Sequence, residues 1–236
     1  MVGASRGIGL EFCRNLKAKG CTVIATHRSA TPPAELLALG VQHTVQLDCA
    51  DPVSVKCAAA DVATKLDGQG LTHLIHNAGI YGPVVSLDGH ARNNRPAAPP
   101  VTKEDLMSVF EINTVGPLLV AQAFQDVLAP PDTARPILAF LTSKVGSVED
   151  NGSGGAYAYR ASKSALNIIA CSLSVDLKEQ ADVLLLHPGY VRTDMTGGKG
   201  FIDADESVKG MLAAIEATDA TVPFRWVDYK AEIVPW

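Results

Sequence analysis

The chain has 236 residues, of which 47% are hydrophobic and 19% charged, which is enough apolar material to bury the core of one large domain. The formal net charge of −5 argues against a nucleic-acid-binding protein, because such a surface needs a basic stripe. No apolar run approaches the roughly 18 residues of a membrane span, and the first residues lack the apolar segment of a signal peptide. We therefore expect no membrane and no nucleic-acid partner.

The cysteines and histidines carry no metal or disulfide pattern. Five cysteines are scattered without a C-x-x-C pair, which predicts reduced thiols in a cytoplasmic protein. The six histidines lack the spacing of metal ligands, so we expect no metal site.

Strand-like apolar runs alternate with helical stretches along the chain. Buried strands are predicted at residues 21–26, 71–76, 136–141 and 182–186, and helices at residues 10–19, 53–66, 103–127 and 157–179. Near-continuous apolar strands are typical of parallel sheets that are covered on both faces. The alternation predicts an α/β fold with a doubly wound parallel sheet and helices on both faces.

No linker divides this pattern, so residues 1–236 are expected to form a single domain. Residues 82–100 hold four prolines around a polar centre, which indicates a loop or an insertion.

A glycine-rich segment precedes the first predicted helix. It consists of Gly3, Ala4, Ser5, Arg6, Gly7, Ile8 and Gly9, in the spacing G-x-x-x-G-x-G. Small residues let backbone N–H groups approach a pyrophosphate, and a helix N-terminus favours its negative charge. Glycine turns before helices are also common without a ligand, so this motif needs support from elsewhere in the chain.

The choice of cofactor depends on the residues after the next strand. Enzymes of this architecture that use NAD place an acidic residue there for the ribose hydroxyls, but no acid lies between Glu11 and Glu35. Arg28 occupies this region, and Arg6 lies in the glycine-rich segment. Because guanidinium suits a 2′-phosphate in charge and geometry, we expect NADP(H) in preference to NAD(H).

Tyr159 and Lys163 are four residues apart in a predicted helix, which puts both side chains on one face. The lysine charge is expected to lower the pKa of the phenol, which could then exchange a proton with a carbonyl oxygen. Tyr157 lacks such a partner, because Ala161 lies four residues after it. In isolation, this spacing arises often by chance on helix surfaces.

Two further polar residues are candidates for the same site. Ser143 follows a predicted strand directly, and strand ends carry the ligand sites of open α/β sheets. Ser147 is a competitor that lies further from the strand. Asn113 interrupts a helical pattern in which asparagine is a mediocre helix former, which suggests a role such as holding a water in a proton relay.

Together these residues resemble the short-chain dehydrogenase/reductase family over essentially the whole chain, most closely its C-factor and sniffer-type carbonyl reductases. The resemblance implies a Rossmann-like fold in which Asn113, Ser143, Tyr159 and Lys163 are catalytic. It also implies further cofactor contacts at Asp48, Asn77, Ala78, Gly79, Pro188, Gly189, Val191 and Thr193. Among these, Asp48 would meet the adenine and Thr193 the nicotinamide amide.

The chain departs from the family pattern at four places. His76 replaces an asparagine, Val2 stands where threonine is usual, and residues 82–100 are longer than expected. Only Met1 and Val2 precede Gly3, so we expect a first strand that is truncated, either because the reading frame begins upstream or because the sequence is a truncated record; a tolerated short first strand is the alternative.

The resemblance implies an NADPH-dependent reduction of a small carbonyl compound, whose pocket is expected at residues 79–83, 144–148 and 190–201. A signalling or scaffold protein that binds NADP without turnover is the alternative, since a fold does not fix a function. An epimerase or dehydratase is a third reading, but the chain leaves little room for a sugar-nucleotide domain. Apolar residues on most sides of residues 157–177 predict a homodimer or homotetramer.

Overall fold

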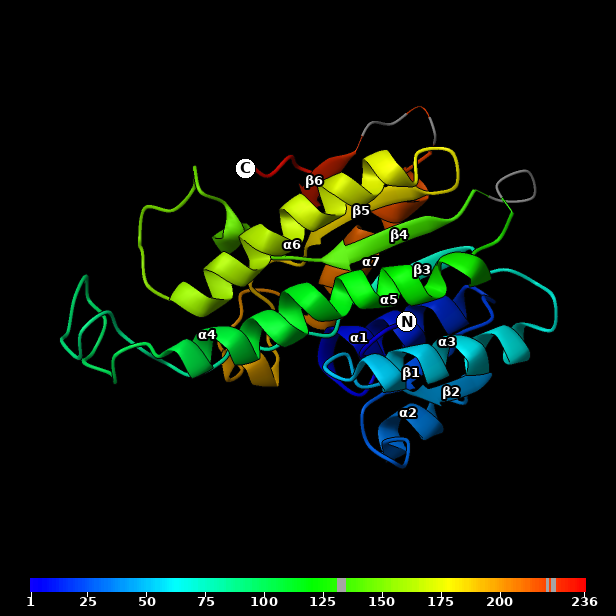
Figure 1. The fold of residues 1–236 in the computed structure, drawn as a ribbon, viewed down its shortest axis with the longest axis horizontal. Helices are drawn as coiled ribbons and strands as arrows, with labels where there is room; N and C mark the ends of the chain where they lie inside the picture. The colour runs from blue at the N-terminus through cyan, green and yellow to red at the C-terminus, as the bar shows by residue number, and fades with distance from the viewer. Residues whose placement is uncertain (131–134, 220, 222–223) are drawn as a thin grey trace.

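The predicted strands form the middle of a parallel sheet in the computed structural model, which describes residues 1–130, 135–219, 221 and 224–236 (Figure 1). These strands are β1 (Ile24–His27), β3 (His73–His76), β4 (Ile137–Leu141) and β5 (Asp182–His187). Two shorter strands that the sequence analysis did not identify, β2 (His43–Gln46) and β6 (Arg225–Asp228), lie at the edges. All strand pairs are parallel, so the predicted fold class is confirmed.

Residues 1–4 connect the pair β2-β1 to the four strands β3-β4-β5-β6. On one side, Thr26 N–H donates to the Met1 carbonyl at 2.9 Å and Ala4 N–H donates to the Thr26 carbonyl at 2.8 Å. On the other side, Val2 N–H donates to the Ile75 carbonyl at 2.8 Å, and Val2 forms a parallel bridge with His76. Residues 1–4 therefore pair with both neighbouring strands in the place of the truncated first strand, through single hydrogen bonds and one isolated bridge.

Helices cover both faces of the sheet (Figure 1). One face carries α3 (Pro52–Leu66), α4 (Lys103–Phe110), α5 (Gly116–Phe124) and α6 (Tyr157–Asp176). The other carries α1 (Gly7–Ala18), α7 (Ala204–Glu216) and the short α2 (Ala34–Ala38). Alternate residues of β4 face opposite layers, because side chains of a strand alternate: Leu138 and Phe140 pack with the first layer, Ala139 with the second.

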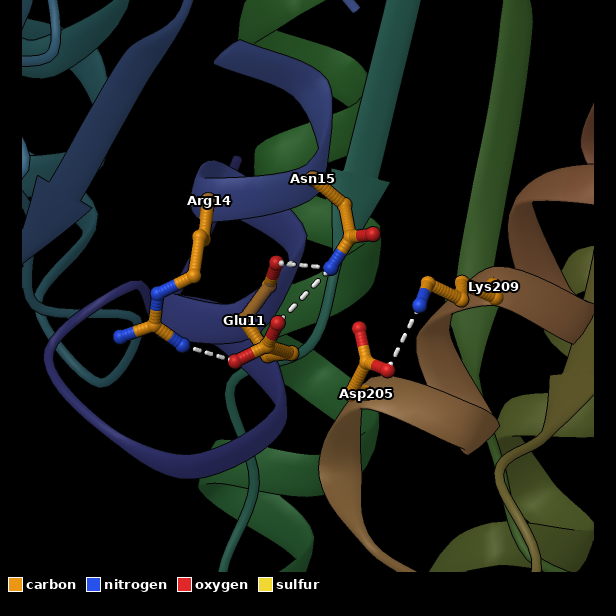
Figure 2. A network of polar contacts seen from close by, with 5 residues as sticks. All are labelled: Glu11, Arg14, Asn15, Asp205 and Lys209. Atoms are coloured by element: carbon orange, nitrogen blue, oxygen red, sulfur yellow. Dashed lines mark hydrogen bonds and ion pairs between the residues drawn. The ribbon is translucent and has the colours of Figure 1, made fainter. Parts of the chain in front are cut away.

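Polar side chains on α1 and α7 form separate networks where the two helices lie side by side (Figure 2). Glu11 is buried and accepts hydrogen bonds from Arg14 and from Asn15, the latter at 2.8 Å. On α7, Lys209 donates to Asp205 at 2.7 Å. The buried carboxylate of Glu11 is thus satisfied, as a buried charge requires.

The helix predicted at residues 103–127 is interrupted. Between α4 and α5, Glu111–Val115 form one π-helical turn, η1, and Gln125–Val127 form a 3₁₀ turn, η2, at the end. By length and hydropathy alone, Lys103–Val127 could span a membrane. In this fold, however, the segment packs against α3 and α6, and Val120, Ala121 and Phe124 are buried in the core.

Candidate active site

The candidate site residues gather at one edge of the sheet. Parallel strands end at the same edge, and residues after those ends form the ligand site of such sheets. Arg28 follows β1, Asn77 follows β3, Ser143 lies two residues after β4, and Pro188 follows β5. Asp48 lies two residues after β2, where its Oδ1 accepts from Ala50 N–H at 3.0 Å.

The glycine-rich segment lies directly on the end of β3. Asn77 Nδ2 donates to the Gly3 carbonyl at 2.8 Å. A Cβ at Gly3, where φ is +78°, would lie 2.8 Å from the Ala78 backbone, and a Cβ at Gly9 would lie 2.0 Å from the Gly3 carbonyl oxygen. Both positions therefore require glycine, which explains the spacing of the motif.

This segment opens α1 at Gly7, and no side chain caps the helix. Arg6 is the N-cap residue in extended conformation, Ser5 precedes it, and Ile8 packs toward the α1–α7 layer. Because the first amides of a helix lack intrahelical acceptors, they are suited to a phosphate group. The tight glycine cradle and this uncapped helix start fit a dinucleotide pyrophosphate.

The two arginines expected at the 2′-phosphate differ in their surroundings. Arg28 is exposed, and its side chain forms no ion pair with any residue in the described part of the chain. Arg6 pairs with Asp194 at 3.0 Å, but both side chains are about three-quarters exposed, so this ion pair contributes little to stability. Both guanidinium groups could therefore turn toward an anionic ligand.

The loop after β5 lies next to the glycine-rich segment. A Cβ at Gly7 would contact the Thr193 methyl group at 3.5 Å, so the two segments are neighbours. Gly189 has φ of +84°, and Val191 is buried and bridges to Ile202. The Pro188 carbonyl accepts from Ser207 Oγ at 2.6 Å, which ties the loop to α7.

Tyr159 and Lys163 lie in the first two turns of α6. Ser143 lies beside the Tyr159 hydroxyl and acts to lower its pKa, and Lys163 Nζ lies 5.9 Å from the centre of the Tyr159 ring. Lys163 is buried and donates to the Leu141 carbonyl at the end of β4, at 2.9 Å. Ser147 instead bonds the Trp236 carbonyl at 3.0 Å, so the structure places Ser143, not Ser147, at the tyrosine.

Burial dominates the pKa values of this pair. It raises the pKa of Tyr159 to about 12, against a smaller lowering by the Ser143 hydrogen bond, and lowers the pKa of Lys163 to about 8. The expected net lowering of the phenol pKa is therefore wrong, because burial outweighs the effects that lower it. Near neutral pH, Tyr159 carries its proton, as a general acid must.

Asn113 occupies the middle of the π-helical turn and is completely buried. Its Oδ1 accepts from Ile80 N–H and its Nδ2 donates to the Ile80 carbonyl, both at 2.8 Å, and Nδ2 also donates to Ser162 Oγ at 3.1 Å. A Cβ at Gly79 would lie 3.2 Å from Asn113 Oδ1 and 3.6 Å from Lys163 Nζ, so these groups converge beside the end of β3. π-Turns are frequent at functional sites.

Tyr81 belongs to the site although the sequence analysis did not single it out. It lies in the expected pocket segment 79–83, and its ring centre is 4.9 Å from that of Tyr159. The Tyr81 side chain is 42% exposed, so it covers one side of Tyr159 and still faces solvent. A lone aromatic residue in a loop has no periodic or motif signal that could have identified it.

His76, which departs from the family pattern, is a buried structural residue. Its ring stacks on Phe140 with centres 6.2 Å apart, and its Nε2 lies 3.7 Å from Cys49 Sγ. Burial lowers the pKa of His76 to about 3. The ring therefore stays neutral and apolar contacts hold it beneath the site.

Comparison with known proteins agrees with this geometry. Residues 1–200 match the family model of the short chain dehydrogenases. The C-signal protein of Myxococcus xanthus is 40% identical over 164 residues, which are 69% of this chain and 91% of that protein.

Two solved structures superpose on the whole chain and on 97% of their own chains. The NADPH-bound carbonyl reductase from chicken fatty liver has a TM-score of 0.87 at 32% identity. The carbonyl reductase Sniffer of D. melanogaster has a TM-score of 0.86 at 30% identity. The expected resemblance is confirmed, and the chain belongs to the short-chain dehydrogenase family.

Proposed function

We propose that this chain is an NADPH-dependent carbonyl reductase that converts an aldehyde, ketone or quinone to the alcohol. The observation that carries the proposal is the convergence of Ser143 on the Tyr159 hydroxyl, with Lys163 and Asn113 buried beside it. Membership of an oxidoreductase family and the likeness to an NADPH-bound carbonyl reductase support it.

Each side chain has a separate task in the proposed reaction. When bound, the reduced nicotinamide supplies the hydride for the carbonyl carbon. Tyr159 donates its proton to the carbonyl oxygen, and Ser143 holds that oxygen by a hydrogen bond. Lys163 binds the ribose hydroxyls and stabilises the phenolate that remains, while Asn113 holds a water that returns the proton. The products are the alcohol and NADP⁺.

The preference for NADP(H) is assigned to Arg28, with Arg6 as a second group. Arg28 is exposed at the end of β1, where an acid would select NAD. Release of Arg6 from its exposed pair with Asp194 would cost little. Two guanidinium groups can therefore meet the 2′-phosphate.

Replacing Tyr159 by phenylalanine tests the chemistry. Tyr159→Phe removes the proton donor and keeps the ring, so kcat should fall by about 10²–10⁴-fold while the NADPH Kd is nearly unchanged. Tyr229→Phe is the matched control, because Tyr229 directly follows β6 and its hydroxyl has no role in the proposed reaction. Near-normal turnover by Tyr159→Phe would rule out the mechanism.

A binding protein without turnover is the second candidate, and the 40% identity to C-signal favours it. It would keep the glycine-rich segment and the cofactor but need no proton transfer. NADPH oxidation with a panel of aldehydes, ketones and quinones separates the two. NADPH binding without oxidation by any member of the panel would support the signalling role.

We further propose that the protein is cytoplasmic and forms a homodimer or homotetramer through α6 and residues 103–127. Its five cysteines are free thiols, as expected in a reducing compartment. Apolar side chains on these helices remain exposed, including Met107, Leu118, Ile168 and Val175. Burying them against a second copy would remove apolar surface from water.

A further inference from the structure

A pocket lies between residues 82–100 and the start of α6. It opens to solvent and measures about 480 Å³ when the space at its open mouth is included. Its walls are mainly apolar, with Val84, Leu87 and Pro96 from the loop and Tyr157 from α6, and Arg95 lies among them. Residues 82–100 thus have a defined role in the fold, since they form most of a cavity.

Hydrogen bonds hold this loop in shape around the cavity. At its base, Ser86 forms a bridge with Pro100, and Ser86 Oγ donates to the Ala98 carbonyl at 2.6 Å. At its tip, Arg92 forms an antiparallel bridge with Arg95. The hydrogen bonds within the loop therefore define the shape of the pocket.

The pocket contains a cation without an acidic partner. Arg92 pairs with Asp88, but Arg95 forms no ion pair in the part of the chain that the structure describes. The Arg95 guanidinium lies against Gly155, where a Cβ would be 1.5 Å from its nearest nitrogen. An anion that reached this guanidinium from the pocket would gain a charged hydrogen bond.

Two segments of the chain connect the pocket wall to residues of the proposed reaction centre. Tyr157 in its wall is two residues before Tyr159 on α6. Val84, also in the wall, is three residues after Tyr81, whose ring contacts the Tyr159 ring. A molecule whose carbonyl group lies at Tyr159 could therefore extend past Tyr81 into the pocket.

From these observations we propose that the pocket binds the distal end of an elongated carbonyl substrate, an apolar chain that ends in a carboxylate paired with Arg95. This inference rests on the proposed reductase function and specifies its substrate class. The apolar walls select the chain, and Arg95 selects the terminal charge.

The test compares aldehydes of the form OHC–(CH₂)ₙ–COO⁻ of increasing length with their methyl esters. At the length that spans the two sites, kcat/KM of the acid should exceed that of the ester. Arg95→Gln should lower kcat/KM of that acid about ten- to hundredfold, the range for loss of a charged hydrogen bond. The ester and benzaldehyde should change less than about twofold, because the ester carries no charge to pair with Arg95 and benzaldehyde is too short to reach it.

Two further variants separate charge from folding. Arg95→Lys keeps the charge and should restore part of the preference for the acid. Lys178→Gln removes an exposed cation just beyond the opposite end of α6 and should leave the acid-to-ester ratio unchanged. Equal losses for acid and ester in Arg95→Gln would overturn the inference.

A binding measurement distinguishes failure of the pocket from failure of the reductase function. Dodecanoate and dodecanol are titrated calorimetrically into wild type and Arg95→Gln. Tighter binding of dodecanoate in wild type, lost in the variant, supports the pocket even if no aldehyde is reduced. Equal affinities of the two proteins for dodecanoate would overturn the pocket, whatever the outcome of the turnover assays.

Discussion

His76 makes stability depend on pH in a way that one substitution can isolate. Its pKa is lowered by burial from 6.5 to about 3, so below pH 6.5 the unfolded chain binds a proton that the folded chain does not. Stability must therefore fall as the pH drops from about 7 toward 3. The contribution is fully present above the unfolded pKa and is lost as the solution becomes acidic.

The size of this effect follows from proton linkage. Each pH unit below the unfolded pKa changes the free energy of unfolding by about 1.4 kcal/mol, so one such histidine accounts for about 2 kcal/mol between pH 7 and pH 5. The result is the same for any folded pKa below about 4, because the folded ring is then neutral at both pH values. His76→Asn removes the titrating group and restores the asparagine of the family pattern.

The assay is urea unfolding of both proteins at pH 7 and pH 5. Wild type should lose about 2 kcal/mol more between these pH values than His76→Asn does. Loss of the Phe140 and Cys49 contacts changes the variant equally at both pH values and cancels in the comparison. His90→Asn, at an exposed histidine of the loop, is the matched control. Equal pH sensitivity in wild type and His76→Asn would refute the reasoning.

Three other substitutions or measurements test separate parts of the structure. Gly9→Ala should lower Tm and weaken NADPH binding, because its Cβ would lie 2.0 Å from the Gly3 carbonyl oxygen; unchanged Tm and Kd would contradict the tight cradle. Arg28→Ala should raise the NADPH Kd about ten- to hundredfold and leave the NADH Kd nearly unchanged, since only NADPH carries the 2′-phosphate; equal effects would show that Arg28 does not discriminate. Light scattering at micromolar concentration should report a dimer or tetramer, and Ile168→Glu on the exposed face of α6 should weaken it; a monomeric wild type would count against the proposed interface.

The sequence predicted the central strands because they are continuous apolar runs. It did not identify β2 or β6, whose four residues include polar side chains at the sheet edge. The strand predicted from residue 21 begins at Ile24, since Cys21 and Thr22 are exposed beyond the pairing region. The amphipathic helix α7 was also missed, although its buried residues follow a helical period.

The residues of the candidate site could be predicted from motifs, but the properties that depend on burial could not. The strand and helix pattern placed Ser143 after a strand and Tyr159 with Lys163 on one helix, and the resemblance to the family joined them into one site. The upward shift of the Tyr159 pKa could not be predicted in this way. The spacing shows the nearby charge of Lys163 but not the desolvation that raises the pKa. The π-turn at Asn113 likewise arises from a tertiary partner, the Ile80 backbone, that no local pattern reveals.

Chemistry and substrate choice rest on different parts of this molecule. Lys163 is hydrogen-bonded to the end of β4 and Asn113 to the segment after β3, so both are held by the sheet that forms the core. The wall formed by residues 82–100 is attached mainly through its own bridges and its contact with Gly155. Changes in that loop can therefore alter which carbonyl compound reaches Tyr159 without moving the groups that transfer its proton. In the proposed function, residues 82–100 therefore determine specificity separately from the residues that transfer the proton, in keeping with the rule that loops on a common fold carry specificity.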